Sequence, residues 1–351
     1  MKRVLYLIII YIIQIFFSCS QSGKKTKKGS LHYARNFYVE KREGYKLLHL
    51  IRPYPGASEQ QWILIERGKK VNIPDSLQSL PRLNVPLRSI VPMSTTHLIY
   101  LLALGEADKV TGFPHVDYIR MPYFRRLKRE GKLVDVGNEM RPDLERIIQL
   151  HPEAVFVFST GDDGKDFNLL EQAGISVIYV SEWLEAHPLG RAEWIKFFGY
   201  LTGKEKKGDS IFVSIEKAYL TIKHKSDTIV SDRKPKVLQA AEFRGVWFVP
   251  GGKTWASVMI RDAGGIPLPE KDTSTHTLRM GPERVFQLLA KADLWINSGY
   301  AKPEDSVFIK KTKMIMLKDL LPGSDTVSFF EWSPLYPDQI LIKLNEILYG
   351  K

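Results

Sequence analysis

Residues 88–96 are Arg88-Ser89-Ile90-Val91-Pro92-Met93-Ser94-Thr95-Thr96, and Leu102-Ala103-Leu104-Gly105 follows a short distance downstream. The run from Ser89 to Met93 is short and apolar, which is typical of a buried strand. The three hydroxylic residues after it favour the start of a helix, and Gly105 suits the left-handed turn that ends one. This stretch therefore predicts a strand, a helix over His97 to Leu104, and a stop at the glycine.

The same alternation of strands and helices continues downstream. In the first part, strands are predicted at 110–113, 154–158 and 175–180, and helices near 144–150 and 167–173. A long helical pattern from about His187 to His224 follows, with interruptions expected near Gly203 and Gly208. Beyond it, strands are predicted at 237–241, 246–249 and 294–296, and helices at 255–263, 285–290 and 339–348. Strands that alternate with helices form parallel sheets. We therefore predict an α/β fold with two Rossmann-like lobes, 86–186 and 231–351, joined by a helical connector at 187–230.

Residues 31–85 have a different pattern. Aromatic and β-branched clusters at Tyr33 to Val39 and Trp62 to Ile65 are separated by glycine and proline. They predict a small antiparallel β extension before the first lobe. The proline-rich stretch from Pro74 to Pro86 is expected to separate this extension from the lobe.

The first thirty residues have the pattern of a secretion signal and a tether. Lys2 and Arg3 precede a 14-residue apolar run, Val4 to Phe17, which is shorter than the roughly 20 residues of a membrane-spanning helix. Phe16-Phe17-Ser18-Cys19 resembles a bacterial lipobox, at which cleavage would leave Cys19 as a lipidated N-terminus. We therefore expect a signal peptide over 1–18, a tether over 19–30, and a lipid-anchored protein of the cell envelope that faces the periplasm. An ordinary signal peptide with an incidental cysteine is the alternative.

Charge and cysteine content exclude several classes. The 351 residues carry a formal charge of +12, but six lysines and arginines and no acids lie in the first 28 residues. The remainder has 45 basic and 39 acidic residues, an excess of +6 that gives no argument for nucleic-acid binding. Because Cys19 is the only cysteine, intramolecular disulfides, Fe–S clusters and cysteine-rich zinc sites are excluded.

Further motifs give the chain a family resemblance. It resembles the helical-backbone class (class III, cluster A) of bacterial substrate-binding proteins of ABC importers, which includes ferric-siderophore, haem and cobalamin binders. The similarity runs from about Val85 to Leu348. Besides residues 88–105 it rests on Val136-Gly137 through Leu144-Glu145, His151-Pro152-Glu153-Ala154-Val155, Ala173-Gly174-Ile175-Ser176-Val177, Gly251-Gly252 and Gly264-Gly265. The resemblance implies a receptor that captures a metal chelate or corrinoid between its lobes and delivers it to an ABC permease dimer. We expect a monomer with no catalytic activity and no cofactor.

Three alternatives stay open at this point. One is a receptor for a bare metal ion, held by His97, His115 and an acidic residue across a cleft. Another is an enzyme that hydrolyses or reduces the chelate, although the sequence has no GxSxG or HExxH motif. Such an enzyme is not predicted to bind a nucleotide through Gly251-Gly252-Lys253-Thr254, because Trp247 stands where the P-loop motif needs glycine. The third is a partner of an outer-membrane transporter.

Candidate ligand-binding residues follow from the rule that open α/β sheets bind ligands beyond the carboxyl ends of their strands. A large chelate needs aromatic faces and a few polar groups. These criteria select Ser94, Thr95, Ser159, Thr160 and Trp183 in the first lobe, and Phe243, Arg244, Trp247, Tyr300 and Trp332 in the second. The resemblance adds His115, in the loop Phe113-Pro114-His115-Val116-Asp117-Tyr118. Arg244 is suited to neutralise a ferric chelate or a carboxylate.

Glu145 and Glu283 occupy equivalent positions in a repeated element. Glu145-Arg146-Ile147-Ile148-Gln149-Leu150 matches Glu283-Arg284-Val285-Phe286-Gln287-Leu288 at an offset of 138 residues. An acid in the first turn of a helix interacts favourably with the helix dipole. The resemblance implies a second role, since one glutamate per lobe at this helix start docks on arginines of the permease. The two roles are compatible.

Overall fold

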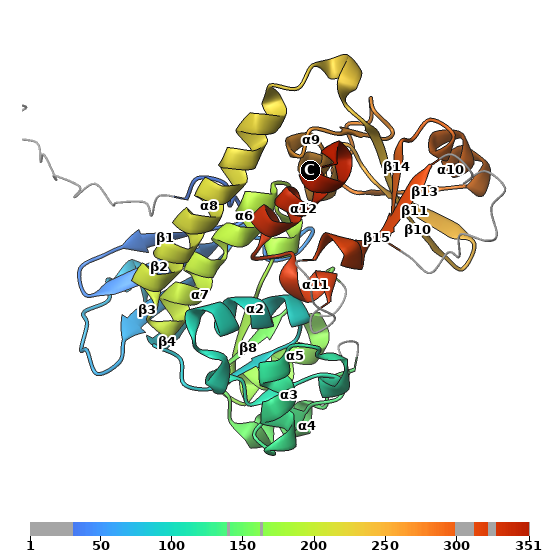
Figure 1. The fold of residues 1–351 in the computed structure, drawn as a ribbon. Coiled ribbons are helices and arrows are strands. Elements are labelled where there is room, and N and C mark those ends of the chain that lie inside the picture. The colour runs from blue at the N-terminus through green and yellow to red at the C-terminus, as the bar shows by residue number, and fades with distance from the viewer. Residues whose placement is uncertain (1–30, 139–140, 162–163, 299–311, 322–327, 351) are drawn as a thin grey trace, which may run out of the picture.

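The computed structural model describes residues 31–138, 141–161, 164–298, 312–321 and 328–350. The predicted signal peptide and tether with Cys19, and Tyr300, lie outside these residues. Within them, two α/β lobes lie at different ends of a central group of helices, and a small β-sheet lies beside those helices (Figure 1). Among the described residues, no helix is both long and apolar enough to cross a membrane.

The N-terminal lobe contains the parallel sheet that its alternating pattern predicts. β5 and β9 flank β8, and a single bridge between Ile90 and Val110 leads to the parallel pair β6 and β7. The strands are β5 (Ile90–Pro92), β6 (Gly112–Phe113), β7 (Val134–Asp135), β8 (Ala154–Val157) and β9 (Ser176–Tyr179). The helices are α2 (Thr95–Leu104), α3 (Pro122–Arg129), α4 (Leu144–Leu150) and α5 (Gly164–Gln172). Ser94 caps α2 and Gly105, at φ 77°, ends it, as the sequence predicts.

The C-terminal lobe has a mixed sheet, in the order β13-β11-β10-β14-β15, with β12 beside β10. β12, β14 and β15 are parallel to β10, whereas β11 and β13 are antiparallel to their neighbours. The strands are β10 (Lys236–Phe243), β11 (Val246–Pro250), β12 (Ile266–Pro267), β13 (Thr277–Met280), β14 (Leu294–Asn297) and β15 (Lys313–Met316); the helices are α9 (Trp255–Asp262), α10 (Pro282–Leu289), α11 (Phe329–Trp332) and α12 (Pro337–Tyr349).

The antiparallel part of this sheet was not predicted. β10 and β11 are joined by a two-residue turn, Arg244-Gly245, whose φ angles are both positive, 53° and 79°. Such a turn makes a hairpin, because it matches the twist of antiparallel strands. Arginine is uncommon at its first position, so the sequence gives only the glycine as a signal.

The connector consists of three helices: α6 (Pro188–Glu193), α7 (Ile195–Thr202) and α8 (Glu205–Asp227). Gly203 ends α7 at φ 72°, where an interruption was expected. The expected interruption near Gly208 is wrong, since Gly208 lies inside α8. A Cβ there would stand 3.1 Å from the carbonyl oxygen of Ile195, so this glycine allows α8 to approach α7 closely.

The N-terminal extension is a four-stranded sheet. β1 (Phe37–Lys41), β2 (Tyr45–Leu50) and β3 (Gln60–Glu66) are antiparallel, as predicted, but β4 (Arg82–Val85) joins β3 in parallel. The proline-rich stretch therefore ends in a strand rather than only separating two units. Phe37 packs against Trp194 and Phe197, with ring centroids 4.7 and 5.6 Å apart. The extension thus shares a hydrophobic core with the connector.

Two buried carboxylates fix the segment that leads into β1. Glu193, 0% exposed, accepts hydrogen bonds from the backbone amides of His32, Tyr33 and Ala34 at 3.0, 2.8 and 2.9 Å. Glu185, 3% exposed, accepts from the amides of residues 35 and 36, both at 3.0 Å, and from the indole of Trp194 at 3.0 Å. Burial raises the pKa of Glu185, and these hydrogen bonds act in the opposite direction. Five successive amides, from residue 32 to residue 36, are held by two side chains of the connector region.

We expect Glu193→Ala to lower the free energy of unfolding by at least about 3 kcal/mol. The variant leaves three amides without their charged acceptor, and hydrogen bonds to charged groups contribute about 1.5–3 kcal/mol each. Urea unfolding measures the change. Glu171→Ala, on the exposed surface of α5, is the control. A loss no larger than that of the control would show that this contact is not needed for stability.

Candidate ligand-binding site

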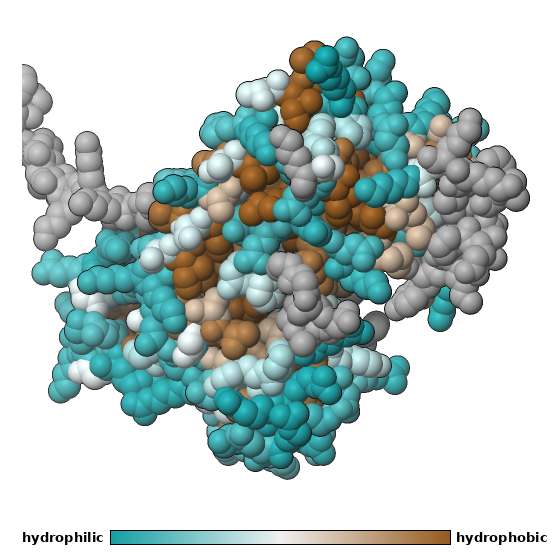
Figure 2. All heavy atoms as spheres, in the orientation of Figure 1, coloured by the Kyte–Doolittle hydropathy of each residue, from teal (hydrophilic) through white to brown (hydrophobic). Residues whose placement is uncertain are grey.

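Most of the predicted ligand-binding residues lie just after the carboxyl ends of strands, namely Ser94, Thr95, His115, Ser159, Thr160, Trp183 and Arg244. Phe243 and Trp247 lie within β10 and β11, and Trp332 lies on α11. On the side of the helices the lobes touch: the backbone amide of Arg120 donates to Glu331 at 2.8 Å, and the hydroxyl of Tyr100 donates to the carbonyl of Pro334 at 3.4 Å. Away from these contacts, the outline of the molecule is indented between the two lobes (Figure 2). The candidate site consists of the predicted residues at the strand ends of the two lobes.

In the N-terminal lobe, several predicted polar residues already have structural roles. The Ser94 hydroxyl accepts from the amide of Thr96, and Ser159 is 1% exposed and accepts from the amide of Gly161 at 3.0 Å. Thr95 is half-buried and Thr160 is exposed. The structure thus leaves Thr160 as the most accessible hydroxyl of this predicted set.

Aromatic residues provide a broader surface beside them. Trp183 is half-buried, and its ring lies 5.1 Å from that of Phe158, which is 39% exposed. The indole nitrogen of Trp183 has no hydrogen-bond partner within the described residues. Phe158 was predicted only as the last residue of a strand and was not selected as a ligand candidate; its position at the carboxyl end of β8 is the signal that could have identified it.

The loop after β6 supplies a second aromatic pair. His115 is exposed at φ 49°, and its ring lies 4.9 Å from that of Tyr118, which is 71% exposed. Two hydrogen bonds fix this loop: the backbone amide of His115 donates to the carbonyl of Gly137, and that of Val116 donates to the carboxylate of Asp135. The imidazole is therefore presented on an anchored turn.

In the C-terminal lobe, the hairpin between β10 and β11 carries an aromatic residue and a cation at its tip. Arg244 and Phe243 are both exposed, and the guanidinium lies 5.2 Å from the centre of the Phe243 ring. Within the described residues, Arg244 makes no ion pair. The prediction that Trp247 faces the ligand does not fit the structure. Trp247 is 7% exposed, and its ring packs 6.1 Å from Phe286 and from Trp295 in the core of the lobe.

Trp332 is half-buried on α11. Its indole donates to Gln339 at 3.1 Å, and its ring lies 4.5 Å from that of Tyr336. These contacts hold the side chain against α12. At most one edge of this tryptophan is therefore available to a ligand.

The sequence analysis missed a buried cation at the junction of the lobes. Arg191, on α6, is 7% exposed and makes no ion pair within the described residues. Its guanidinium lies 4.8 Å from the centre of the Trp255 ring, which stacks on Phe329. The charge of Arg191 acts on the buried carboxylate of Glu182, but no direct ion pair is formed, so an anionic ligand would find a positive charge here that is only partly compensated. No local pattern marks Arg191, because its burial depends on the packing of α6 against α9.

A buried acid and a buried histidine lie near this arginine. Glu182 accepts from the Thr96 hydroxyl at 2.7 Å, and its other oxygen is 3.9 Å from Nε2 of His97; both residues are 0% exposed. Burial raises the pKa of Glu182, and the charge of Arg191 opposes this. Burial lowers the pKa of His97 to about 3, so its imidazole is neutral at pH 7.

The bare-metal alternative requires His97 and His115 to act together. His97 lies inside the protein beside Glu182, whereas His115 is exposed on its loop. Within the described ranges, no group of three or more histidines, cysteines and acids is placed to hold a metal ion.

Glu145 and Glu283 occupy matching positions in the two lobes. Each is exposed in the first turn of its helix, α4 or α10, and the apolar residue two positions later, Ile147 or Val285, is buried. Asp143 already caps α4 by accepting from the amide of Arg146 at 3.0 Å. The N-cap role at α4 is thus taken by another acid, and Glu145 projects from the helix surface.

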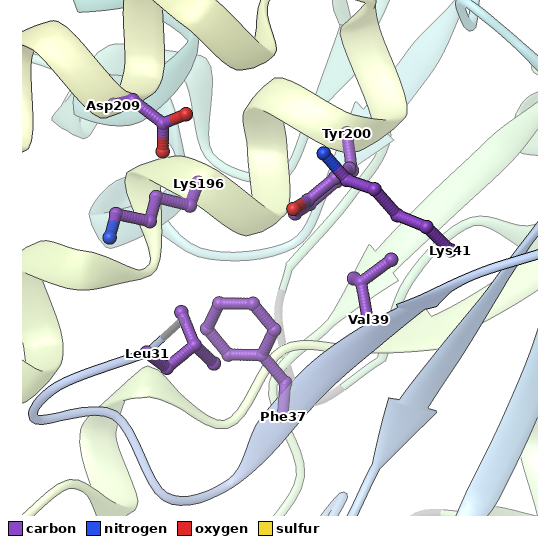
Figure 3. A pocket seen from close by; sticks show the side chains of 7 residues that line it. All are labelled: Leu31, Phe37, Val39, Lys41, Lys196, Tyr200 and Asp209. Carbon is purple, nitrogen blue, oxygen red and sulfur yellow. The ribbon is translucent and has the colours of Figure 1, made fainter. Parts of the chain in front are cut away.

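A cavity of about 110 Å³ lies on a different side of the molecule, between β1 and helices α7 and α8 (Figure 3). It has an apolar floor and a polar rim, and it is lined by Leu31, Phe37, Val39, Lys41, Lys196, Tyr200 and Asp209. Pockets for ligands of drug size or larger measure roughly 300–1,000 Å³. This cavity is too small for a metal chelate of the predicted kind.

The architecture and sequence together identify the class of protein. Residues 90–315 match the profile of the periplasmic binding protein family, and the chain belongs to this family. An uncharacterized lipoprotein of Methanocaldococcus jannaschii is 25% identical over 272 residues, which is 71% of this chain and 64% of that protein. A second uncharacterized lipoprotein of the same organism is 25% identical over 211 residues, 58% of this chain and 53% of its own length. The chain thus spans less than two thirds of the length of these relatives.

Solved structures share the fold. The petrobactin-binding protein YclQ of Bacillus subtilis has a TM-score of 0.60 at 16% identity, over 77% of this chain and 94% of that one. The triscatecholate siderophore-binding protein FeuA of the same species has 0.58 at 18%, over 81% and 99%. The haem-binding protein HutB of Vibrio cholerae has 0.58 at 16%, over 74% and 98%. The predicted fold class, two α/β lobes joined through helices with a β extension, is confirmed, as is the resemblance to class III binding proteins.

The burial of His97 predicts that the stability of the wild type and that of His97→Leu depend differently on pH. The pKa of His97 falls to about 3 in the folded state from 6.5, so between these values the unfolded chain binds the extra proton. The stability that this group contributes is present above pH 6.5 and is lost as the pH falls. Relative to His97→Leu, the wild type should lose up to ~1.4 kcal/mol per pH unit below 6.5.

Urea unfolding of the wild type and His97→Leu at pH 7, 6 and 5 measures this difference in the free energy of unfolding. Both proteins contain Glu182, so the opposing contribution of that carboxyl largely cancels. His224→Leu, at an exposed position of α8, is the control for the loss of a histidine. Parallel pH profiles for the wild type and His97→Leu would contradict the burial argument.

Proposed function

We propose that this chain is the substrate-binding lipoprotein of an ABC importer, and that it captures a ferric siderophore, haem or cobalamin between its lobes. The observation that carries the proposal is the buried charge of Arg191 at the lobe junction, which forms no direct ion pair within the described residues. Two aromatic pairs on strand-end loops support it: the exposed Phe158 with the half-buried Trp183, and the exposed His115 with Tyr118. Broad apolar faces around a few charged groups suit a large chelate with acidic substituents.

The binding unit is proposed to comprise the extension (31–85), the N-terminal lobe (86–186), the connector (187–230) and the C-terminal lobe (231–351). Cys19 is the proposed site of lipid attachment, which would hold the protein at the outer face of a membrane. The lipoprotein names of the two similar archaeal proteins support the anchor. Family membership supports a location outside the cytoplasmic membrane.

Delivery is proposed to use Glu145 and Glu283. Their support is geometric: each is exposed at the start of an equivalent helix, one in each lobe (Figure 1). Two acids on two lobes suit a receptor that meets the two halves of a permease dimer.

Substitution of two arginines tests the proposed ligand-binding site. We expect Arg191→Ala and Arg244→Ala each to weaken binding of an anionic chelate at least tenfold, about 1.4 kcal/mol, because both remove positive charge from the site. Titration of ferric catecholate siderophore, haem and cobalamin, followed by the fluorescence of the seven tryptophans, measures the affinities. Arg233→Ala is the matched control, since Arg233 is exposed and precedes β10, at the opposite end of the same strand from Arg244. Unchanged affinity for all three ligands in both variants would reject this site.

Delivery is tested by charge reversal. Glu145→Lys with Glu283→Lys should bind ligand normally but fail to stimulate the permease's ATPase and transport in reconstituted vesicles, because like charges at an interface cost several kcal/mol. Glu171→Lys with Glu270→Lys makes the same change in net charge at other exposed positions and should transport normally. If the two glutamates only stabilise their helices, the double mutant will show a modest fall in thermal stability and ordinary transport.

A further inference from the structure

A strongly basic surface covers α3 and its flanks. Residues 120–132 contain six arginines and lysines and a single acid, Glu130. The six cations are all exposed, whereas the apolar residues of the helix, Phe124 and Leu127, are 0% and 3% exposed. We call this surface the basic face; it consists of Arg120, Arg125, Arg126, Lys128, Arg129 and Lys132.

Only half of these cations have acidic partners. Lys128 pairs with Asp117, and Glu130 is shared by Arg126 at 3.7 Å and Lys132 at 2.9 Å. Within the described residues, the other three, Arg120, Arg125 and Arg129, make no ion pair. The basic face therefore carries a net positive charge that the protein itself does not neutralise.

The chemistry of the face favours a diffuse anionic surface over a protein partner. Protein interfaces are centred on aromatic or apolar anchors in well-packed pockets. On α3 the large apolar side chains point inward, and the Tyr123 ring is covered on one side by Arg126 at 4.7 Å. Long cationic side chains on a convex helix suit anionic lipid headgroups, each cation adding attraction that decays within a Debye length.

The position of α3 agrees with such a contact. α3 lies at the same end of the N-terminal lobe as α4, which carries Glu145, and the surface there is hydrophilic (Figures 1 and 2). A tethered protein meets its own membrane at high effective concentration, so a weak attraction is sufficient.

We propose that the basic face binds anionic lipid headgroups and thereby turns the N-terminal lobe toward the membrane. The proposal relies on the proposed function only for the lipid anchor; it does not depend on which ligand is bound. Its test therefore fails or succeeds separately from ligand binding and transport.

The experiment uses a truncated chain, residues 20–351, which contains every described element and lacks Cys19, so it cannot be lipidated. Its binding is measured by co-sedimentation with phosphatidylcholine vesicles, with and without one third phosphatidylglycerol, at low and high salt. We expect binding only to the anionic vesicles, and its loss at high salt. Arg125→Glu with Arg129→Glu should weaken it at least about thirtyfold, the equivalent of about 2 kcal/mol. Lys217→Glu with Lys225→Glu is the matched control, because it changes net charge equally at exposed, unpaired positions of α8.

A second measurement covers misfolding of the charge-reversal variant. Because Cys19 is the only cysteine, the truncated chain has none, and Arg129→Cys accepts a single fluorophore. Quencher-labelled anionic lipid should quench that probe more than one at Val213→Cys, which is exposed on α8. Equal loss of binding in both charge-reversal variants, or equal quenching at both positions, would overturn the proposal. No binding to anionic vesicles at low salt would also overturn it, and would leave an acidic protein as the partner to seek.

Discussion

The hydrogen bonds that Glu185 and Glu193 accept from residues 32–36 hold the N-terminal segment to the helices at the centre of the molecule. A buried carboxylate is costly unless its oxygens are satisfied, and here backbone amides, one indole and, at Glu193, the ammonium of Lys196 satisfy them. The segment fixed in this way sets the position of β1, whose Phe37 packs on the helix that follows Glu193. The β extension is therefore an integral part of the connector's core, although by sequence it stands apart from both lobes.

The same short region, residues 182–194, also reaches the candidate ligand site. Glu182 bonds Thr96 at the start of α2, while Arg191 stacks on Trp255 at the start of α9. One short region thus contacts the N-terminal segment, the N-terminal lobe and the C-terminal lobe. Large hinge motion between the lobes would have to break the hydrogen bond from Tyr100 to the carbonyl of Pro334 and bend helices that are packed on several sides. The arrangement favours small lobe movements on ligand binding, as the helical connector alone already suggests.

Much of the fold was predictable because its signals are local. Ser94 and Gly105 mark the two ends of α2, and the strands of the N-terminal lobe are short apolar runs. The errors have tertiary causes. Trp247 lies on a strand that pairs on both sides, so which face its ring takes depends on the Arg244-Gly245 turn and on α10 below it. Arg191 was missed because its burial exists only once α6 and α9 pack. The sequence therefore predicts where the loops of the candidate site lie. It does not predict which of their side chains are exposed, or which buried charges lack a direct ion pair.

The two cations of the proposed site differ in a way that assigns them different effects on binding. Arg244 is exposed at a hairpin tip, where salt screens its charge and where it acts on an approaching ligand before contact; its effect belongs mainly to the association rate. Arg191 is buried, so its charge is weakly screened and is felt only by a ligand that has entered; its effect belongs mainly to the dissociation rate. If both bind one anionic chelate, raising the salt concentration should slow association through Arg244 while leaving the contribution of Arg191 nearly intact. A ligand that lacks negative charge would gain from neither, and would have to be held by the aromatic pairs alone.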